Sequence, residues 1–360
     1  MGCKVCRGKI EENQFDFSNQ KNKKETLDNL LKQNECEYIS EDEFNSAIPE
    51  DYLNKIKENI NIPEELKEIK GFDVKPIKFK NENIFKGKWN LENKMEGNGI
   101  YYLKHDNVLV QGIWKNGELI YGKILLPDNS IYEGYIINSK FNGKGKLITE
   151  DKEYEGTFEN GEFIEGKIKF PEAEFEGKLE KDEFKDGKMT WNNGYIYEGD
   201  FNGYNLQGKG KLIGPENGDI YEGDFDNNLF HGIGKYIYSK TQNEYEGEFE
   251  QGIIKGKGKF TEKDKLIYEG TWDNNLPHGI GKIMNIDNTC ILKSAFRYGK
   301  MVDEPTYEKG QKEDMNFDIN ELVIEPEEMN LKIKDLKYLS IFNSEATQFK
   351  LKSLPSFLNE

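Results

Sequence analysis

The first residues of this chain are of types that accept lipid groups. The chain opens Met1-Gly2-Cys3-Lys4-Val5-Cys6-Arg7. Removal of Met1 exposes Gly2 for myristoylation, and the thiols of Cys3 and Cys6 are candidates for palmitoylation. Position 6 holds a cysteine where the myristoylation motif prefers serine or threonine. The pattern therefore predicts an acylation signal over residues 1–10, with Gly2, Cys3 and Cys6 as its modified residues.

Basic side chains beside this signal would favour an anionic leaflet. One myristoyl chain holds a protein to a membrane only marginally, and a second acyl chain or a basic patch makes anchoring stable. Lys4, Arg7 and Lys9 each add about 1 kcal/mol near such a surface. The opening resembles that of Src-family tyrosine kinases, which begin Met-Gly-Cys with a second cysteine nearby. We expect the protein at the cytoplasmic face of a plasma, ciliary or cortical membrane.

Two alternatives for these cysteines remain open. Cys3 and Cys6 are either incidental, or they form half of a zinc site that needs two further ligands. For the two further ligands, only Cys36 and three distant histidines remain as candidates. Four cysteines in 360 residues are too few for a disulfide framework.

Composition excludes several classes of protein. The chain has 67 acidic and 50 basic side chains and a formal net charge of -17. Non-specific nucleic-acid binding needs a basic face, so no nucleic-acid partner is expected. No run of about 18 apolar residues predicts a membrane span, and no apolar h-region follows Met1. The sequence favours an intracellular protein.

Other motifs that suggest chemistry fail on spacing. The Gly-Lys-Gly-Lys runs at 143–146, 208–211 and 256–259 lack the four-residue gap and Lys-Ser/Thr end of a P-loop. Asp224, Asp226 and Asn228 imitate the start of a calcium loop, but later ligand positions do not fit. His231 and His278 occupy the same slot of two different repeats, about 19 Å apart. We therefore predict no catalytic residue, no cofactor and no metal site, and hence no enzyme.

A repeated phrase dominates the middle of the chain. It consists of an apolar or aromatic residue, usually Glu, usually Gly, any residue, and usually Phe or Trp, as in Tyr221-Glu-Gly-Asp-Phe225. It begins at residues 85, 110, 132, 154, 175, 197, 221, 245, 268 and, in degraded form, 292. A period of this length is typical of a stacked array that has no single catalytic core.

Each repeat reads as a β-hairpin. Alternate residues of a strand share a face, so Tyr221, Gly223 and Phe225 point one way while Glu222 and Asp224 point the other. The Asp226-Asn-Asn228 segment is typical of a turn. Glycine weakens a strand unless something approaches closely. We therefore expect aromatic rings to lie over the glycines.

These residues resemble the MORN repeat, with nine clear copies and one degenerate copy. The resemblance implies an all-β fold: an elongated, single-layer antiparallel sheet of about ten stacked hairpins. Ten hairpins at about 4.8 Å per strand would span about 95 Å. The predicted organisation is an acylation signal (1–10), a polar linker with short helices (11–83), the repeat array (84–300) and a C-terminal extension (301–360).

The ends carry helical signals. Ser40-Glu-Asp-Glu43 is a capping box, and Pro49 and Pro63 stand where helices begin. An amphipathic stripe is expected in the C-terminal extension, at Met329, Ile333, Leu336 and Leu339. Both extensions are expected to cap the open edges of the sheet, with partner binding as the alternative for the C-terminal helix.

Three repeats depart from the pattern in the return strand. Ile124, Ile168 and Met189 are read as replacing its second glycine, after a turn one residue longer. They are interpreted either as drift or as an apolar patch on which a protein partner docks.

Two functions fit the sequence. MORN-repeat proteins serve as scaffolds at membranes and cytoskeletal structures, including cilia. The first hypothesis is a non-enzymatic scaffold, anchored by acyl chains, that links a membrane to a cytoskeletal or ciliary protein partner. The alternative is a phosphoinositide-binding module that uses its lysine-rich strands to regulate a separate lipid kinase.

Overall fold

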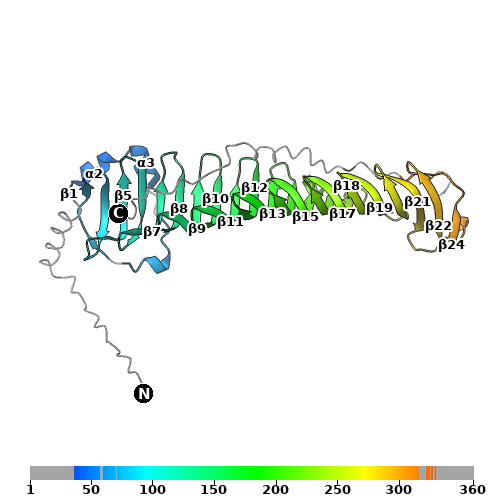
Figure 1. Ribbon diagram of the computed structural model, residues 1–360, viewed down its shortest axis with the longest axis horizontal. Helices are drawn as coiled ribbons and strands as arrows, with labels where there is room; N and C mark the ends of the chain where they lie inside the picture. The colour runs from blue at the N-terminus through cyan, green and yellow to red at the C-terminus, as the bar shows by residue number, and fades with distance from the viewer. Residues whose placement is uncertain are drawn as a thin grey trace, which may run out of the picture. The chain divides into compact units, whose positions relative to one another are not determined.

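The computed structural model describes residues 36–56, 60–69, 71–315, 322–324, 326 and 329 (Figure 1). The strands form one antiparallel sheet of 24 strands, and the described part contains two short α-helices. The predicted all-β, single-layer fold is confirmed. The chain divides into two compact units after Lys140.

The first unit holds both helices and the first strands. It contains β1 (Cys36–Tyr38), α2 (Glu41–Ala47), α3 (Glu50–Ile56), a 3-10 turn (Glu64–Leu66), β2 (Phe72–Asp73), β3 (Ile77–Phe79), β4 (Ile84–Trp89), β5 (Met95–Leu103), β6 (Val108–Lys115), β7 (Glu118–Leu125) and β8 (Ile131–Ile137). From β4 to β8 each strand pairs with the next. Before β4, strands β2 and β3 pair with it and β1 pairs with β3.

The second unit is a run of hairpins. Its strands are β9 (Lys140–Ile148), β10 (Glu153–Glu159), β11 (Glu162–Lys169), β12 (Ala173–Glu180), β13 (Glu183–Trp191), β14 (Ile196–Asn202), β15 (Asn205–Ile213), β16 (Ile220–Asp226), β17 (Leu229–Tyr238), β18 (Asn243–Glu250), β19 (Ile253–Glu262), β20 (Leu266–Asp273), β21 (Leu276–Asn285), β22 (Ile291–Arg297), β23 (Lys300–Met301) and β24 (Thr306–Lys309). Two 3-10 turns (Pro215–Asn217 and Lys312–Asp314) complete it. Figure 1 shows these strands succeeding one another in chain order.

The helices begin where the sequence predicts. Ser40 precedes α2, and its Oγ accepts a hydrogen bond of 3.1 Å from the Glu43 N–H. Pro49 immediately precedes α3. Their apolar residues pack on the connection ends of β4 to β8, in a buried cluster of Ile39, Phe44, Ile48, Tyr52, Ile56, Ile84, Tyr102, Leu109 and Leu125.

The sequence suggested that the helices cap an open edge of the sheet, but they do not. Their contacts run across several consecutive strands, because the cluster takes one side chain from each of β4 to β7. Strands β1, β2 and β3 cover the edge of β4 instead. At the other end β24 pairs with β22, and Val323 bridges to Lys300. The predicted C-terminal helix lies outside the described residues except for Met329.

Each unit has a column of glycines that runs at right angles to its strands. In the first unit Gly87, Gly99, Gly112, Gly122 and Gly134 pair in succession. In the second unit one glycine from each strand from β9 to β21 pairs with its neighbour: Gly145, Gly156, Gly166, Gly177, Gly187, Gly199, Gly210, Gly223, Gly234, Gly247, Gly258, Gly270 and Gly281. We call this the glycine column. It ends at β22, where Ser294 faces Gly281.

In the regular hairpins tyrosine rings occupy the space that side chains would take on this column, and elsewhere Phe85, Leu119, Phe163 and Phe175 do so. A Cβ on Gly234 would stand 2.5 Å from the Tyr221 hydroxyl oxygen, and one on Gly223 would stand 2.5 Å from the Gly234 Cα. The Tyr221 hydroxyl donates a 2.7 Å hydrogen bond to the carbonyl of Asp224. The expected ring-over-glycine packing is therefore confirmed, with the ring supplied by the same hairpin. Burial raises the pKa of Tyr221, which keeps its phenol a donor.

The hairpin turns and bulges use left-handed residues. Asn227 and Asn228 have φ of 47° and 67°, in the region that asparagine tolerates. In the regular return strand, Gly232 (φ 56°) and Ile233 have no cross-strand partner in β16 and form a two-residue bulge. Gly208, Gly256 and Gly279 repeat this bulge with positive φ.

The proposed patch of Ile124, Ile168 and Met189 is wrong in its placement. These residues pair with Val110, Tyr154 and Phe175, so they hold the slot that Tyr236 holds opposite Tyr221. The glycine column continues through their hairpins unbroken. What these hairpins lack is the bulge glycine, because their bulge is one residue long. The three side chains are 0 %, 2 % and 0 % exposed, so they belong to the core and offer no docking surface.

We predict that Gly223→Ala lowers the free energy of unfolding by about 1–3 kcal/mol, the usual range for overpacking. The added methyl would meet the Gly234 backbone, which cannot rotate away. Glu222→Ala, one residue earlier, is the control. Its side chain is 69 % exposed and lies 3.7 Å from Lys211, so its loss should cost less than about 0.5 kcal/mol. Urea denaturation measures both, and equal midpoints would contradict the steric role of the column.

Candidate functional site

The polar face of the second unit is hollowed above the glycine column. Two depressions, of about 600 Å³ and about 1010 Å³, share Ile233 and Glu246 and so form one continuous groove. Its floor is the glycine backbone from Gly210 to Gly281. The column glycines point toward the rings on the other face. On the polar face the floor is therefore bare backbone, between the rows of side chains that come from the residues before and after each glycine. We call this hollow the polar groove.

One wall of the polar groove is a row of alternating charges. Lysine and glutamate face each other from strand to strand, in the order Lys211, Glu222, Lys235, Glu246, Lys259, Glu269 and Lys282. Ion pairs tie this row to itself and to neighbours: Lys211–Glu222 at 3.7 Å, Lys235–Glu244 at 2.8 Å and Lys282–Glu308 at 2.6 Å. These side chains are well exposed, so each pair contributes about 0–1 kcal/mol.

The opposite wall alternates charged and apolar side chains. Lys209, Ile233, Lys257 and Ile280 each follow a bulge glycine and line the groove. The Ile233 and Ile280 side chains are 56 % and 61 % exposed. The two-residue bulge places the residue after its glycine on the polar face without a partner in the preceding strand, while in the following strand Ile233 faces Glu248 and Ile280 faces Ala295. Two large apolar side chains are therefore exposed to solvent in corresponding positions of two repeats.

Asp224 stabilises the bulge beside this wall. Its Oδ2 accepts a 3.0 Å hydrogen bond from the Ile233 N–H, and its Oδ1 lies 2.6 Å from Lys209 Nζ. Asp200 accepts the Lys209 N–H in the same way, at 3.1 Å. Desolvation acts to raise the pKa of Asp224, but the bonds from Lys209 and Ile233 outweigh it, and the pKa lies below its ordinary value.

The residues that imitate catalytic or metal-binding motifs have structural roles. The three Gly-Lys-Gly-Lys runs lie within β9, β15 and β19. Asn228 Oδ1 accepts the Leu206 N–H at 2.7 Å, and the His278 ring packs 5.7 Å from that of Tyr298. Within the described ranges no cluster of three or more His, Cys, Asp or Glu residues could hold a metal ion. Burial raises the pKa of the Cys36 thiol to about 11, which leaves it unreactive at neutral pH.

The predicted lipidation residues cannot be placed. Gly2, Cys3, Lys4, Cys6, Arg7 and Lys9 lie outside the described residues. The acylation signal therefore stays a prediction from sequence. No helix in the part of the chain that the structure describes is long and apolar enough to cross a bilayer.

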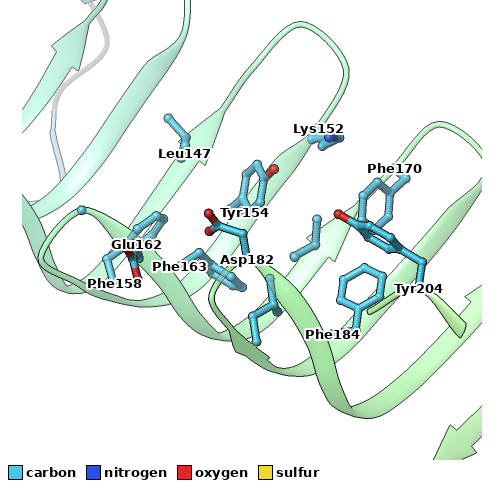
Figure 2. Close-up of a pocket in the computed structure, with 13 residues that line it drawn as sticks. Leu147, Lys152, Tyr154, Phe158, Glu162, Phe163, Phe170, Asp182, Phe184 and Tyr204 are labelled. Carbon is cyan, nitrogen blue, oxygen red and sulfur yellow. The ribbon is translucent and has the colours of Figure 1, made fainter. Parts of the chain in front are cut away.

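A second cavity, which the sequence did not reveal, opens on the ring face. It has a volume of about 50 Å³ and lies among β9 to β15, where the Tyr154 ring stands between those of Phe163 and Phe170 (Figure 2). Leu179 lines it at the position where most repeats have Phe or Trp. That exception to the phrase is the only signal in the sequence that could have located it.

Five segments of the chain match the MORN repeat: residues 132–152, 197–218, 221–240, 245–264 and 268–287. The chain carries MORN repeats. Nine clear copies and one degenerate copy were expected, and five are supported. Residues 153–196, between the first and second matched segments, have no match. They contain the hairpins β10–β11 and β12–β13, whose bulges are one residue long. Proteins with MORN repeats are often membrane-associated or protein-binding scaffolds.

Comparison with other proteins adds little to the MORN repeats. The search of curated proteins finds no match. Among solved structures, the wild-type TCP10 domain of Danio rerio CPAP is 10 % identical over 66 % of this chain and 90 % of that chain, with a TM-score of 0.17. The same domain in complex with a peptide of Danio rerio STIL is 9 % identical over 67 % and 98 %, with a TM-score of 0.18. Scores this low carry no structural argument.

We predict that Asp224→Asn lowers the melting temperature at neutral pH and that the difference from wild type shrinks in acid. The native pKa of Asp224 is depressed, so its ionised form stabilises the fold above its unfolded pKa. That contribution is lost as the pH falls through the native pKa. Thermal melts of both proteins across an acid series measure it. A difference that stays constant down the series would show that the carboxylate charge is irrelevant to the bulge.

Proposed function

We propose that this chain is a non-enzymatic scaffold whose polar groove binds an extended segment of a partner protein. The single observation that carries this proposal is the groove itself, with its glycine floor and the exposed Ile233 and Ile280 on one wall. Backbone groups in the floor are already paired within the sheet, so recognition would fall to the walls. The paired charges of the other wall suit a polar rim around an apolar anchor.

The spacing of the two isoleucines suggests the pattern of the partner. Ile233 lies in β17 and Ile280 in β21, four strands apart, which corresponds to about 19 Å. An extended chain advances about 3.3 Å per residue, so a partner would present two apolar side chains about six residues apart. Lys257, midway between them, favours an acidic residue at the centre of that segment.

Membrane anchoring is the second element of the proposal. It rests on the sequence of Gly2, Cys3 and Cys6, and on the basic residues that accompany them. An acylated scaffold of this kind would hold its partner at the cytoplasmic face of a membrane. The resemblance to MORN-repeat scaffolds suggests a cytoskeletal or ciliary partner.

The phosphoinositide alternative has less support. The lysines of the polar face alternate with glutamates, and several are ion-paired, such as Lys167 with Glu174 at 3.1 Å and Lys235 with Glu244 at 2.8 Å. A phosphate headgroup would have to compete with carboxylates at each of these lysines. The chain as a whole carries a charge of -17, which opposes binding to an anionic surface.

We predict that the double variant Ile233→Ser, Ile280→Ser weakens partner binding by about tenfold or more. Burying an isoleucine stabilises a complex by about 1.5–3 kcal/mol, and about 1.4 kcal/mol corresponds to a tenfold change. A photo-crosslinking residue at position 233 identifies the partner, and its affinity is then measured for each variant. Ile286→Ser is the control, because Ile286 is 45 % exposed but lies outside the groove. If both variants bind like wild type, the groove is not the binding site.

We also predict that Gly2→Ala, or Cys3→Ser together with Cys6→Ser, moves the protein from the membrane fraction to the supernatant. Each change removes one of two lipid signals, and one signal alone holds a membrane only marginally. Cys36→Ser is the control, since Cys36 lies in β1 and is no part of the signal. Unchanged fractionation of both variants would exclude acyl anchoring while leaving the groove proposal intact.

A further inference from the structure

The ring-face cavity exists because one ring is missing from the core. In the regular hairpins each phrase tyrosine packs edge-on against the closing aromatic residue of the next repeat: Tyr197 on Phe225 (5.2 Å), Tyr221 on Phe249 (5.1 Å), Tyr245 on Trp272 (5.2 Å) and Tyr268 on Phe296 (5.0 Å). The corresponding residue for Tyr154 is Leu179. Leucine is smaller than these aromatic side chains, and the space it leaves is part of the cavity.

Tyr154 is displaced from the position of its counterparts. The phrase tyrosines at 197, 221, 245 and 268 are 0 % exposed, and each hydroxyl donates to the carbonyl three residues later. The Tyr154 hydroxyl makes no hydrogen bond to the described residues, and its ring is only partly buried. The Phe163 ring takes its place near the glycine column, 3.1 Å from where a Cβ on Gly166 would lie.

Four rings border the cavity on the side of the hairpin turns. The Tyr154 and Phe163 centroids are 5.4 Å apart, and those of Phe184 and Tyr204 are 5.3 Å apart. We call these four residues the ring box. Figure 2 shows them around the cavity, together with the carboxylates of Asp182 and Glu162.

The two carboxylates lack a cation. Neither Asp182 nor Glu162 has an ion pair or hydrogen bond with another described residue. Desolvation, and to a lesser degree the charge of Glu162, raises the pKa of Asp182 above its ordinary value. A positive charge bound between them would relieve both effects. Aromatic faces attract the same kind of ligand through their quadrupoles.

We propose that the ring box with Asp182 and Glu162 binds a quaternary ammonium group, as in the side chain of a trimethylated lysine. Rings supply cation–π attraction to the methylated nitrogen, and the carboxylates supply the opposite charge. The cavity is small, at about 50 Å³, which disfavours a large ring system as the ligand. The site is separate from the polar groove, because it lies on the opposite face of the sheet.

Another part of the cavity already holds an ammonium group. Lys152 Nζ lies 5.8 Å from the Phe170 ring centroid, and the side chain is only 9 % exposed. Lys152 and Phe170 lie in the connections between hairpins, at one end of the strands. Asp182 and Tyr204 lie in the hairpin turns, at the other end of the strands. The side with the carboxylates is therefore the side left for a ligand.

Calorimetric titration of the full chain with trimethyl-lysine amide tests the proposal. Saturable binding is expected, and 3,3-dimethyl-1-butanol, whose neutral tert-butyl head has the same shape, should bind at least about tenfold more weakly, since cation–π attraction in a desolvated site reaches about 2 kcal/mol. Phosphocholine should also bind more weakly, because its phosphate is repelled by Glu162 and Asp182. Equal binding of the neutral compound would overturn the proposal, and preferential binding of phosphocholine would point to a lipid headgroup instead.

Two variants locate the site. Leu179→Phe restores the missing ring and should abolish binding, and Asp182→Asn should weaken it about tenfold, as expected for the loss of a partly desolvated charge interaction. Asp273→Asn, which changes a partly exposed carboxylate at the end of β20 in a regular repeat, should bind like wild type. Thermal melts establish that each variant is folded. If Leu179→Phe does not fold, the affinity of Asp182→Asn for trimethyl-lysine amide and the binding of 3,3-dimethyl-1-butanol to wild type still test the proposal. Wild-type affinity in Asp182→Asn would overturn the proposal.

Discussion

The structure depends on the close approach of tyrosine rings to a backbone without side chains. Every strand from β9 to β21 contributes a glycine to the column, and in the regular hairpins the phrase tyrosine covers the glycines of its own hairpin. A single methyl at Gly234 would meet the Tyr221 hydroxyl oxygen at 2.5 Å. Glycine costs conformational entropy in a strand, of about 0.5–1 kcal/mol relative to alanine. Burial of a whole aromatic side chain outweighs that cost, since each buries about 150–250 Å².

The same constraint divides the work between the two faces. On the ring face, rings and glycines are closely packed across adjacent hairpins, so a substitution there also changes the packing of the neighbouring hairpins. The polar face carries only exposed pairs such as Lys211–Glu222, whose individual contribution is small. Changes on the polar face therefore cost little stability. A repeat protein can alter its binding surface there, for example from Lys257 to Ile280 in the same slot, while the core stays intact.

Much of this organisation follows from the sequence, because strand alternation and turn chemistry are local properties. The faces of Tyr221 and Glu222, the left-handed Asn227 and the start of α2 after Ser40 were all predictable. The register of the irregular hairpins was not. Counted from the turn, Ile124, Ile168 and Met189 fall at the position of the second glycine. Because the bulge is only one residue long, they lie instead at the position that Tyr236 holds opposite Tyr221. Bulge length decides this register, and it depends on whether a residue of positive φ such as Gly232 is present.

The cavity at Leu179 was hidden for a different reason. Whether a tyrosine covers its own glycines depends on a ring contributed by the next hairpin, so no single repeat contains the information. Leu179 withdraws that ring, Phe163 moves over Gly166, and Tyr154 is left with its hydroxyl unbonded. A conservative change at one slot, Leu179 in β12, thus goes with a different placement of two residues in the preceding hairpin. In an array built from near-identical units, such local departures from the pattern are what distinguish one position from the next, so specific binding is best sought where the repeat fails.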